Sequence, residues 1–341
     1  MGIIHREDDL YNAAAIFADG ELKGLVKKMN LPNYGLFDEH RYFQAGTTPV
    51  VVKHPLARIG VTICEDIWFP SGPARDEALW GGADIIINLS ASPYHSGKVE
   101  QRERMLSTRA ADNGVFLAFC NMVGGQDEMV FDGHSALFSP EGDVINRGLP
   151  FEEDYLIADV PVENIFHHRA RDPRRRVSVL IEKPATVSIL EVNPPQSPER
   201  AQLPKREILP ITSEEEVYRA LVTGCRDYTR KNGFERVLLG LSGGIDSALT
   251  ASIAVDALGA GQVVGVTMPS RYSSKGSVDD SAALAKNLGI EMKTIPIEEP
   301  FSAFLEALTP HFEGRAPDVA EENLQARVRG TLLMALSNKF G

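Results

Sequence analysis

The sequence has no excess of basic residues. It holds 35 lysines and arginines against 47 aspartates and glutamates, which gives a formal net charge of −12 at pH 7. A protein of this charge repels a phosphate backbone, so a nucleic-acid partner is not expected. The length of 341 residues is enough for two domains, each with its own core.

Cysteine is scarce, and long apolar runs are missing. The three cysteines lie far apart and form no disulfide framework, which suits a reducing compartment and favours a cytoplasmic location. No apolar run is long enough to span a bilayer, so no membrane partner is expected. We expect Cys120 and Cys225 to be structural, because they lie within an apolar strand and a helix.

The first part of the chain, to about residue 170, alternates apolar strands with turns and two helices. Turn residues predict hairpins around Asp19-Gly20 and in "SPEGDVI". A polar-faced helix is expected in "KVEQRERMLSTRAADNG", which ends at Gly114. Apolar strands are expected in "ARIGVTICED", "ADIIINLSA" and "VFLAFCNMVGG". Buried strands beside amphipathic helices predict a layered α/β domain over residues 1–170.

Residues 171–210 are rich in proline and arginine, and we interpret them as a connector. The second domain, residues 211–341, is regular. Its predicted order is strand 237–241, helix from about 245, strand 262–268, helix 277–288 and strand 292–297. This βαβαβ order predicts a doubly wound parallel sheet. Ser277 and Asp280 suggest a capping box, Gly289 a C-cap, and residues 321–341 a further long helix.

A glycine-rich turn, Ser242 to Ser247 ("SGGIDS"), follows the first of these strands and opens a helix. Free backbone N–H groups at a helix N-terminus form an anion site, usually for phosphate. The turn has neither the lysine of a Walker A loop nor the spacing of a dinucleotide fingerprint. A carboxylate beside a phosphate repels it unless a divalent cation lies between them. Asp246 is therefore a candidate Mg²⁺ ligand.

The turn "SGGIDS" closely resembles the pyrophosphatase loop of the N-type ATP-pyrophosphatases. Together with "MPSRYSS" (268–274) and "EENLQARVRG" (321–330), it resembles the synthetase domain of the glutamine-dependent NAD⁺ synthetase family. That family uses ATP to adenylate the carboxylate of nicotinate adenine dinucleotide and then aminates it with ammonia. For Arg271, phosphate contact and a rim charge remain equally open. The resemblance implies an ATP site at Ser242, Gly243, Gly244, Ile245, Asp246, Ser247 and Met268, with Asn323 and Arg327 contacting ATP or the dinucleotide.

Cys64 ends an apolar strand in "VTICEDIW", where a cysteine is either a small buried residue or a nucleophile. The upstream segment "KKMNLPNYGLFDEHRYF" resembles the lysine segment of the nitrilase, or carbon–nitrogen hydrolase, family. That family uses glutamate, lysine and cysteine as base, oxyanion stabiliser and nucleophile. The motif places the lysine at Lys28, with Lys27 as its competitor. The resemblance implies a further active-site carboxylate at Glu39 and a glutamine pocket at Tyr34 and Glu65.

The two resemblances imply an incomplete nitrilase-like αββα sandwich followed by an incomplete ATP-pyrophosphatase domain. The base glutamate of the nitrilase triad precedes its lysine by dozens of residues, and Lys28 lies too close to Met1 for that. Glu7 and Glu21 lack the context expected of this base. We therefore expect a chain truncated at both ends, which is inactive and folds poorly when expressed alone. When intact, the protein is expected to be a homo-oligomer.

Four functions remain open at this point. The first is glutamine-dependent NAD⁺ synthesis, and the second is a stand-alone amidase with a nucleotide-binding regulatory module. The third is another ATP-pyrophosphatase amidotransferase, but a nitrilase-type first half argues against purine amination, and the acidic charge argues against tRNA thiolation. The fourth, a non-catalytic dinucleotide-binding protein, does not explain Cys64 and Lys28.

Overall fold

The structure is a computed structural model that describes residues 1–193, 203 and 211–340. The chain divides into two compact units, and each is described by itself. The first contains residues 1–124 and 130–216, and the second contains residues 125–129 and 217–341. Among the described residues, no helix has both the length and the apolar character needed to cross a membrane.

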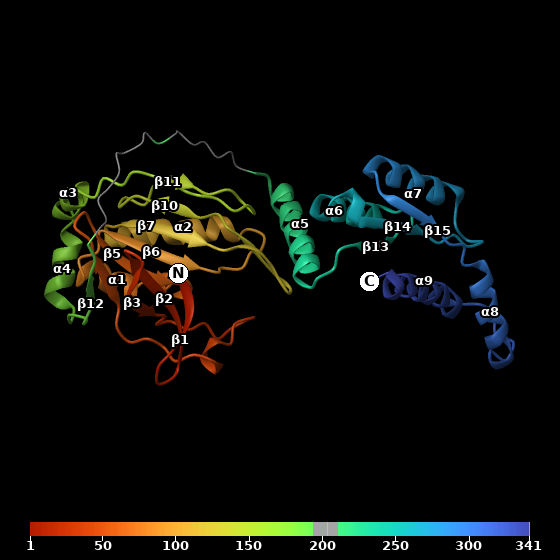
Figure 1. Cartoon of the computed structure of the whole chain (residues 1–341), viewed down its shortest axis with the longest axis horizontal. Coiled ribbons are helices and arrows are strands. Elements are labelled where there is room, and N and C mark those ends of the chain that lie inside the picture. The colour runs from red at the N-terminus through yellow and green to blue at the C-terminus, as the bar shows by residue number, and fades with distance from the viewer. Residues whose placement is uncertain (194–202, 204–210, 341) are drawn as a thin grey trace. The chain divides into compact units, whose positions relative to one another are not determined.

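A seven-stranded sheet forms the centre of the first unit (Figure 1). Its three central strands are parallel and consist largely of β-branched and aromatic residues, which suits strands buried on both faces. In spatial order the strands are β11 (Val144–Arg147), β10 (Ala136–Phe138), β7 (Phe116–Asn121), β6 (Ile85–Ser90), β5 (Arg58–Ile63), β4 (Val50–Lys53) and β12 (Ser188–Glu191).

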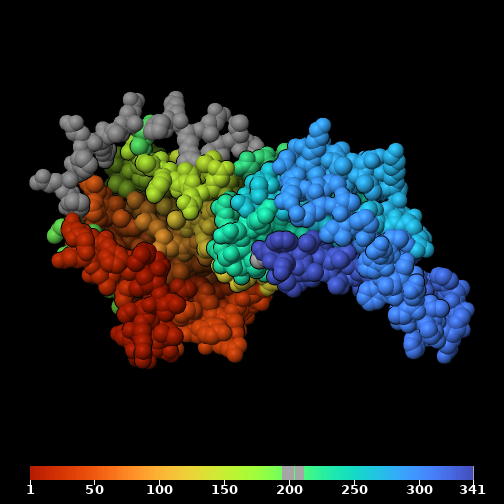
Figure 2. Space-filling view, turned by 45° about the vertical axis from the view of Figure 1, so that its right-hand side comes forward, coloured from red at the N-terminus to blue at the C-terminus, as the bar shows by residue number. Residues whose placement is uncertain are grey.

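A three-stranded antiparallel sheet packs against one face of the large sheet. It consists of β1 (Gly2–Arg6), β2 (Leu10–Ala18) and β3 (Glu21–Lys27), which are red in Figure 2. The predicted hairpin is confirmed, because Asp19 and Gly20 join β2 to β3 with positive φ angles of 53° and 76°. An apolar cluster fills the space between the sheets: Ala14, Val26, Val50, Val52, Val61 and Ile63.

Two helices, α1 (Pro73–Leu79) and α2 (Lys98–Asn113), pack against the large sheet through a separate core. Leu106 of α2 packs there with Ile86, Leu117 and Phe138 of the strands. Gly114 ends α2 in a left-handed conformation, with φ 57°, as predicted. Helix, large sheet and small sheet thus form successive layers, in agreement with the predicted sandwich.

Shorter elements complete the first unit. The described part of the expected connector contains regular structure, because β12 pairs in parallel with β4 from Ser188↔Val50 to Glu191↔Lys53. Residues 194–202 and 204–210 of that segment lie outside the described part of the chain. The remaining elements are the 3-10 turns η1 (Glu39–Arg41) and η2 (Cys64–Ile67) and helices α3 (Asn164–Arg171) and α4 (Pro173–Ile181). The pair of strands β8 (Val123–Gln126) and β9 (Met129–Asp132) includes residues that are assigned to the second unit.

The second unit contains the predicted parallel sheet, in the order β13 (Val237–Gly240), β14 (Val263–Thr267), β15 (Glu291–Thr294). One core joins the sheet to α6 (Ile245–Leu258) and α7 (Lys275–Leu288), and a second joins its other face to α9 (Val319–Phe340). Helices on both faces confirm the doubly wound prediction. The helices are α5 (Ser213–Lys231), α6 (Ile245–Leu258), α7 (Lys275–Leu288), α8 (Glu298–Leu308) and α9 (Val319–Phe340), with 3-10 turns η3 (Ala260–Gln262) and η4 (Thr309–His311).

Two local predictions need correction. The N-cap of α7 is Ser274, whose hydroxyl accepts the backbone N–H of Ser277 at 3.0 Å, so Ser277 does not open the helix. The helix therefore begins two residues earlier than expected, while Gly289 ends it as predicted. Cys120 lies on β7 but is exposed, so it is not a core residue, whereas Cys225 on α5 is half-buried.

Glu77 is a carboxylic acid enclosed in the core of the first unit. Its side chain on α1 is fully buried, and the groups that oppose the effect of burial on its pKa are the backbone N–H groups of Val50 and Val61 on the neighbouring strands. Burial raises the pKa of Glu77 well above its usual value, and the nearby carboxylate of Asp66 raises it further. Folding therefore opposes the ionisation of Glu77.

We expect Glu77→Gln to stabilise the protein at pH 7, because the neutral glutamine has no carboxylate that folding must transfer from water into the core. Above the unfolded pKa near 4.5, the unfolded glutamate is ionised and folding must take up a proton, so wild-type stability falls as pH rises. The advantage of the variant should disappear at about pH 4. Urea unfolding at both pH values measures this difference, and an equal effect at both would contradict the assignment.

Candidate functional site

Cys64 lies where β5 ends, at the first position of the turn η2. Its backbone is left-handed, with φ 45°, a conformation that is uncommon for a residue other than glycine and that recurs at functional sites. Burial raises the pKa of the Cys64 thiol, while the Lys28 ammonium and a hydrogen bond from the Ala91 backbone act in the opposite direction. A cation and a backbone donor therefore both act on this sulfur.

Lys28 directly follows β3, and only 1% of its side chain is exposed. Its Nζ lies 2.7 and 2.8 Å from the two carboxylate oxygens of Glu39 on η1. The neighbouring Lys27 is 30% exposed and pairs at the surface with Glu7. The alternation of a strand explains the difference, because successive side chains point to opposite faces. The structure thus brings Lys28, Glu39 and Cys64 together and leaves Lys27 outside.

Tyr34 and Glu65 lie beside this cluster. The Tyr34 hydroxyl donates a 2.8 Å hydrogen bond to Oε2 of Glu65, the residue after the cysteine. Partial desolvation of that hydroxyl, together with this hydrogen bond, raises the pKa of Tyr34 to about 12. The pair forms an exposed polar rim next to Cys64, a suitable place for the amino and carboxylate groups of an amino acid.

Sequence reasoning missed Lys98, the first residue of α2. Burial lowers the pKa of Lys98, and the charges of Cys64 and Glu65 partly oppose that effect. Its Nζ lies 5.1 Å from the centre of the Trp68 ring. The available signal in the sequence was Gly97, a glycine directly before the expected helix. In the structure it has φ 79° and turns the chain into α2 just before this lysine.

A buried ion pair stabilises the loop between β6 and α2. Arg102 donates to both carboxylate oxygens of Asp132, at 3.1 and 2.5 Å, and both side chains are fully buried. Asn121 donates to the same carboxylate and accepts the backbone N–H of Ser92 at 2.9 Å. Because Ala91 precedes Ser92, this network supports the backbone group that faces the Cys64 thiol.

The two carboxylates considered as substitutes for the triad base both lie at the surface. Glu7 pairs with Lys27, and Glu21 pairs with Lys23 at 2.5 Å. Glu39 is the carboxylate that contacts the Lys28 ammonium. Neither Glu7 nor Glu21 gains support as a catalytic base from these contacts.

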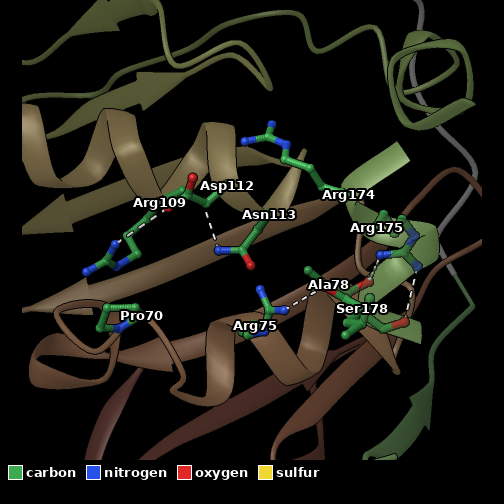
Figure 3. A pocket seen from close by; sticks show the side chains of 10 residues that line it. Pro70, Arg75, Ala78, Arg109, Asp112, Asn113, Arg174, Arg175 and Ser178 are labelled. Carbon is green, nitrogen blue, oxygen red and sulfur yellow. Dashed lines mark hydrogen bonds and ion pairs between the residues drawn. The ribbon is translucent and has the colours of Figure 1, made fainter. Parts of the chain in front are cut away.

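A separate cavity of about 270 Å³ lies among α1, α2 and α4 (Figure 3). Its arginines are bound to structural partners. Arg175 donates to the carbonyls of Ala78 and Leu79 at the end of α1, and Arg75 pairs with Glu182. Arg109 donates to the carbonyls of Ile67 and Trp68, at the end of the cysteine turn, at 3.1 and 2.9 Å. We therefore interpret this cavity as part of the packing that supports the cysteine turn.

In the second unit, the Ser242–Ser247 turn joins β13 to the N-terminus of α6. Gly243 has φ 78°, and a Cβ atom there would meet the backbone oxygen of Ser277 at 2.5 Å, so only glycine fits. The hydroxyl of Ser242 accepts the Gly244 N–H at 3.2 Å, and the Ser247 hydroxyl donates to the Gly244 carbonyl at 3.0 Å. These bonds shape an exposed loop at the positive end of the α6 dipole.

A cavity of about 440 Å³ adjoins this turn. Met268, which is buried, lines it, as do Ser242 and Ser277. Arg329 of α9 also lines it and donates to the Met268 carbonyl at 3.2 Å. Arg329 lies in the segment 321–330 that carries the resemblance, but it was not assigned to the site. The available signal was the helical spacing, which puts it on one face with Ala326 and Leu333.

Other predicted contacts in this unit lie elsewhere. Asn323 and Arg327 are on an exposed face of α9, where the Arg327 side chain donates to the Asn323 carbonyl at 3.2 Å. Arg271 pairs with Glu298, which satisfies its charge at the surface. Ile245 is 80% exposed at the start of α6. The structure therefore brings Ser242 and Met268 to one cavity and leaves Asn323 and Arg327 outside its lining.

Asp246 lies in the first turn of α6 and is exposed. Among the described residues, no group of three or more His, Cys, Asp and Glu side chains could hold a metal ion. A single carboxylate still fits Mg²⁺, which usually takes one or two carboxylates and completes its shell with phosphate oxygens and water. The donor set is thus compatible with a metal that binds together with a nucleotide.

Comparisons with known proteins match both parts of the chain. The carbon–nitrogen hydrolase family model matches residues 1–169, and the NAD synthase family model matches residues 217–341. These matches confirm the two resemblances noted in the sequence.

Relatives that combine both parts are similar along this entire chain. The glutamine-dependent NAD(+) synthetase of Thermotoga maritima is 51% identical over 341 residues, a match that covers 100% of this chain and 59% of that protein. The corresponding protein of Aquifex aeolicus is 45% identical over 340 residues, with the same coverage. The solved structure of the Acinetobacter baumannii enzyme in complex with ADP has a TM-score of 0.84 at 37% identity and covers 100% of this chain and 58% of that chain.

This chain spans about 59% of the length of the two curated relatives. Its hydrolase-type cluster around Cys64 and its glycine-rich turn at Ser242–Ser247 occur in the same order as the two matched family models. Along its whole length this chain is similar to part of the glutamine-dependent NAD(+) synthetases, and its two parts match the carbon–nitrogen hydrolase and NAD synthase families.

Proposed function

We propose that the first unit hydrolyses glutamine and that the second uses the ammonia to convert nicotinate adenine dinucleotide to NAD⁺ with ATP. The observation that carries the first half is the buried Lys28 ammonium, which is paired with Glu39 and acts electrostatically on the Cys64 thiol. A surface lysine beside a structural cysteine would not need this arrangement.

In this proposal, the Cys64 thiolate attacks the side-chain amide carbon of glutamine, and Lys28 stabilises the oxyanion. The carbon–nitrogen bond breaks, and ammonia leaves with the proton that the thiol gave up to a carboxylate base. Water then attacks the thioester, which releases glutamate and restores the thiol. The Tyr34–Glu65 pair would hold the amino-acid end of glutamine.

In the second unit, the 242–247 turn would hold the pyrophosphate of ATP, and the cavity beside Met268 would hold its base. The ADP complex of the Acinetobacter baumannii relative supports a nucleotide in this family. The dinucleotide carboxylate attacks the α-phosphate, pyrophosphate leaves, and ammonia then displaces AMP. Bound Mg²⁺ would neutralise phosphate charge, and Asp246 is the residue that would hold it.

The proposal extends to α9 and to the intact protein. Asn323 and Arg327 would contact ATP or the dinucleotide from the exposed face of α9. The intact protein would be a cytoplasmic homo-oligomer. The alternative is an amidase with a regulatory nucleotide module. Formation of AMP and pyrophosphate in equal amount to NAD⁺ favours the synthetase, whereas glutamine hydrolysis without these products favours the amidase.

We expect Cys64→Ala, in a full-length protein that contains these residues, to abolish NAD⁺ formation from glutamine. Formation from ammonium should remain within about threefold of wild type, because the second unit can take ammonia from solvent and lacks only its internal supply. The assay measures NAD⁺ with each nitrogen source. Cys120→Ala is the matched control, since this exposed cysteine lies in the same sheet. Equal loss with both sources would mean that Cys64 is structural.

We expect Lys28→Ala to lower kcat for glutamine hydrolysis by about a hundredfold or more, which is the usual cost of losing an oxyanion donor. Lys27→Ala should change it less than about twofold, because Lys27 is exposed and paired with Glu7. The two variants remove the same chemical group from adjacent positions, so each is the control for the other. The reverse order of effects would show that the lysine motif is misaligned.

We expect Asp246→Asn to abolish ATP-dependent amidation with either nitrogen source while glutamine hydrolysis persists at least in part. The amide removes the negative charge that a Mg²⁺–phosphate complex needs but keeps the helix start intact. Parallel assays of NAD⁺ and glutamate measure the two activities, with the exposed Asp280→Asn as control. Normal NAD⁺ synthesis by Asp246→Asn would refute the metal assignment.

A further inference from the structure

We propose that Asp66 is a positioning residue whose carboxylate ties the turn that carries Cys64 to the segment that carries Lys28. This inference deepens the proposed glutaminase function and rests on it. Asp66 is only 1% exposed, and it belongs to neither the reacting group nor the polar rim described above.

The two carboxylate oxygens of Asp66 bind different parts of the chain. Oδ2 accepts the backbone N–H of Ile63 at 3.0 Å, which closes the cysteine turn on itself. Oδ1 accepts hydrogen bonds from the backbone N–H of Asn30 at 2.8 Å and from its side-chain amide at 3.1 Å. It also accepts the backbone N–H of Met29 at 3.3 Å. One side chain thus joins residue 63 to residues 29 and 30.

The residues that bind Asp66 are neighbours in sequence of Cys64 and Lys28, the two residues whose side chains must lie close together. Ile63 immediately precedes Cys64, and Met29 immediately follows Lys28. The link is short and charge-assisted at both ends, so a movement of either segment would break hydrogen bonds in the interior. Each broken bond would leave a buried N–H donor unpaired, which is unfavourable. The carboxylate therefore fixes where the Lys28 ammonium can lie relative to the thiol.

The far end of the same turn is held separately. Arg109 donates to the carbonyls of Ile67 and Trp68, so that end stays in place without any help from Asp66. Arg109 reaches the turn from α2. Of these two side chains, only Asp66 connects the turn to the segment that carries Lys28. The loss of Asp66 should therefore uncouple Lys28 from Cys64 and leave the turn itself largely formed.

A carboxylate is required here for a specific reason. All four atoms that face Asp66 are N–H donors, and a carboxylate offers only acceptors. Asparagine at this position would aim an amide N–H at one set of donors. Asp66→Asn therefore breaks one side of the link while it conserves the size of the side chain.

A double-mutant cycle on the Cys64 thiol tests the inference without any need for turnover. In a full-length protein that contains these residues, alkylation of Cys64 by iodoacetamide is followed against pH, and peptide mass spectrometry separates it from Cys120 and Cys225. The charged and titratable groups that face this thiol are Lys28, Glu39, Glu65, Tyr34 and Lys98. The cycle changes Lys28 alone, Asp66 alone, and both.

We expect Lys28→Met to raise the midpoint of the alkylation profile by about one pH unit in the wild-type background, because it removes a cation close to the thiolate. In the Asp66→Asn background, Lys28→Met should raise the midpoint of the alkylation profile by less than a third of the shift seen in the wild-type background. Asp76→Asn on α1 is the matched control, in which the full effect of Lys28→Met should persist. An equal effect of Lys28→Met in all three backgrounds would overturn the proposal.

A milder variant keeps the test decisive if Asp66→Asn does not fold, as judged by circular dichroism. Asn30→Ala removes a single bond to Oδ1 and leaves the Ile63 bond intact. It should reduce the effect of Lys28→Met partially, and an undiminished effect would count against the proposal.

The glutaminase assay separates this inference from the proposed function. Asp66→Asn should lower kcat for glutamine by about a hundredfold, as a misplaced reacting geometry does, with KM changed less than threefold. If the wild-type protein does not hydrolyse glutamine, the proposed function fails while the alkylation cycle still decides the role of Asp66. If glutamine is hydrolysed but kcat is unchanged in Asp66→Asn, the positioning role fails alone.

Discussion

The buried ammonium of Lys28 is the constraint on which the first unit depends. A charge that is removed from water needs a partner of opposite sign, and Glu39 supplies it at 2.7 Å. Removing one member of such a pair costs about 3–5 kcal/mol, so the two residues must be placed together by the fold. Lys28 follows the last residue of β3 in the small sheet, and Cys64 follows the last residue of β5 in the large sheet.

The second unit is organised around backbone geometry. Its candidate phosphate-binding feature is a turn in which Gly243 lies so close to Ser277 that no side chain fits. The turn leaves helix amides at the end of a parallel strand, the usual position for a phosphate site in this type of sheet. Arg329 then holds the Met268 carbonyl at the wall of the adjoining cavity.

The sequence predicted these two units well wherever the determinants are local. The Asp19-Gly20 hairpin, the Gly114 and Gly289 helix ends and the order of strands and helices follow from turn chemistry and periodicity. The N-cap of α7 was predicted at Ser277 instead of Ser274, because several serines close together in the sequence offer competing N-caps. Cys120, which was expected to be structural because it lies in an apolar run, is exposed, since such a run does not reveal which face of a strand is covered.

The sequence by itself determined the chemistry that is available: a cysteine at a strand end, a lysine pair upstream and a glycine turn before a helix. Only the tertiary structure distinguishes the two lysines, because Lys28 is buried and Lys27 is exposed, and burial depends on the face to which each side chain points. It also revealed Asp66, whose partners lie 36 and 37 residues away in the chain. Hydrogen bonds across such separations exist only after the sheets have packed, and so no local pattern encodes them.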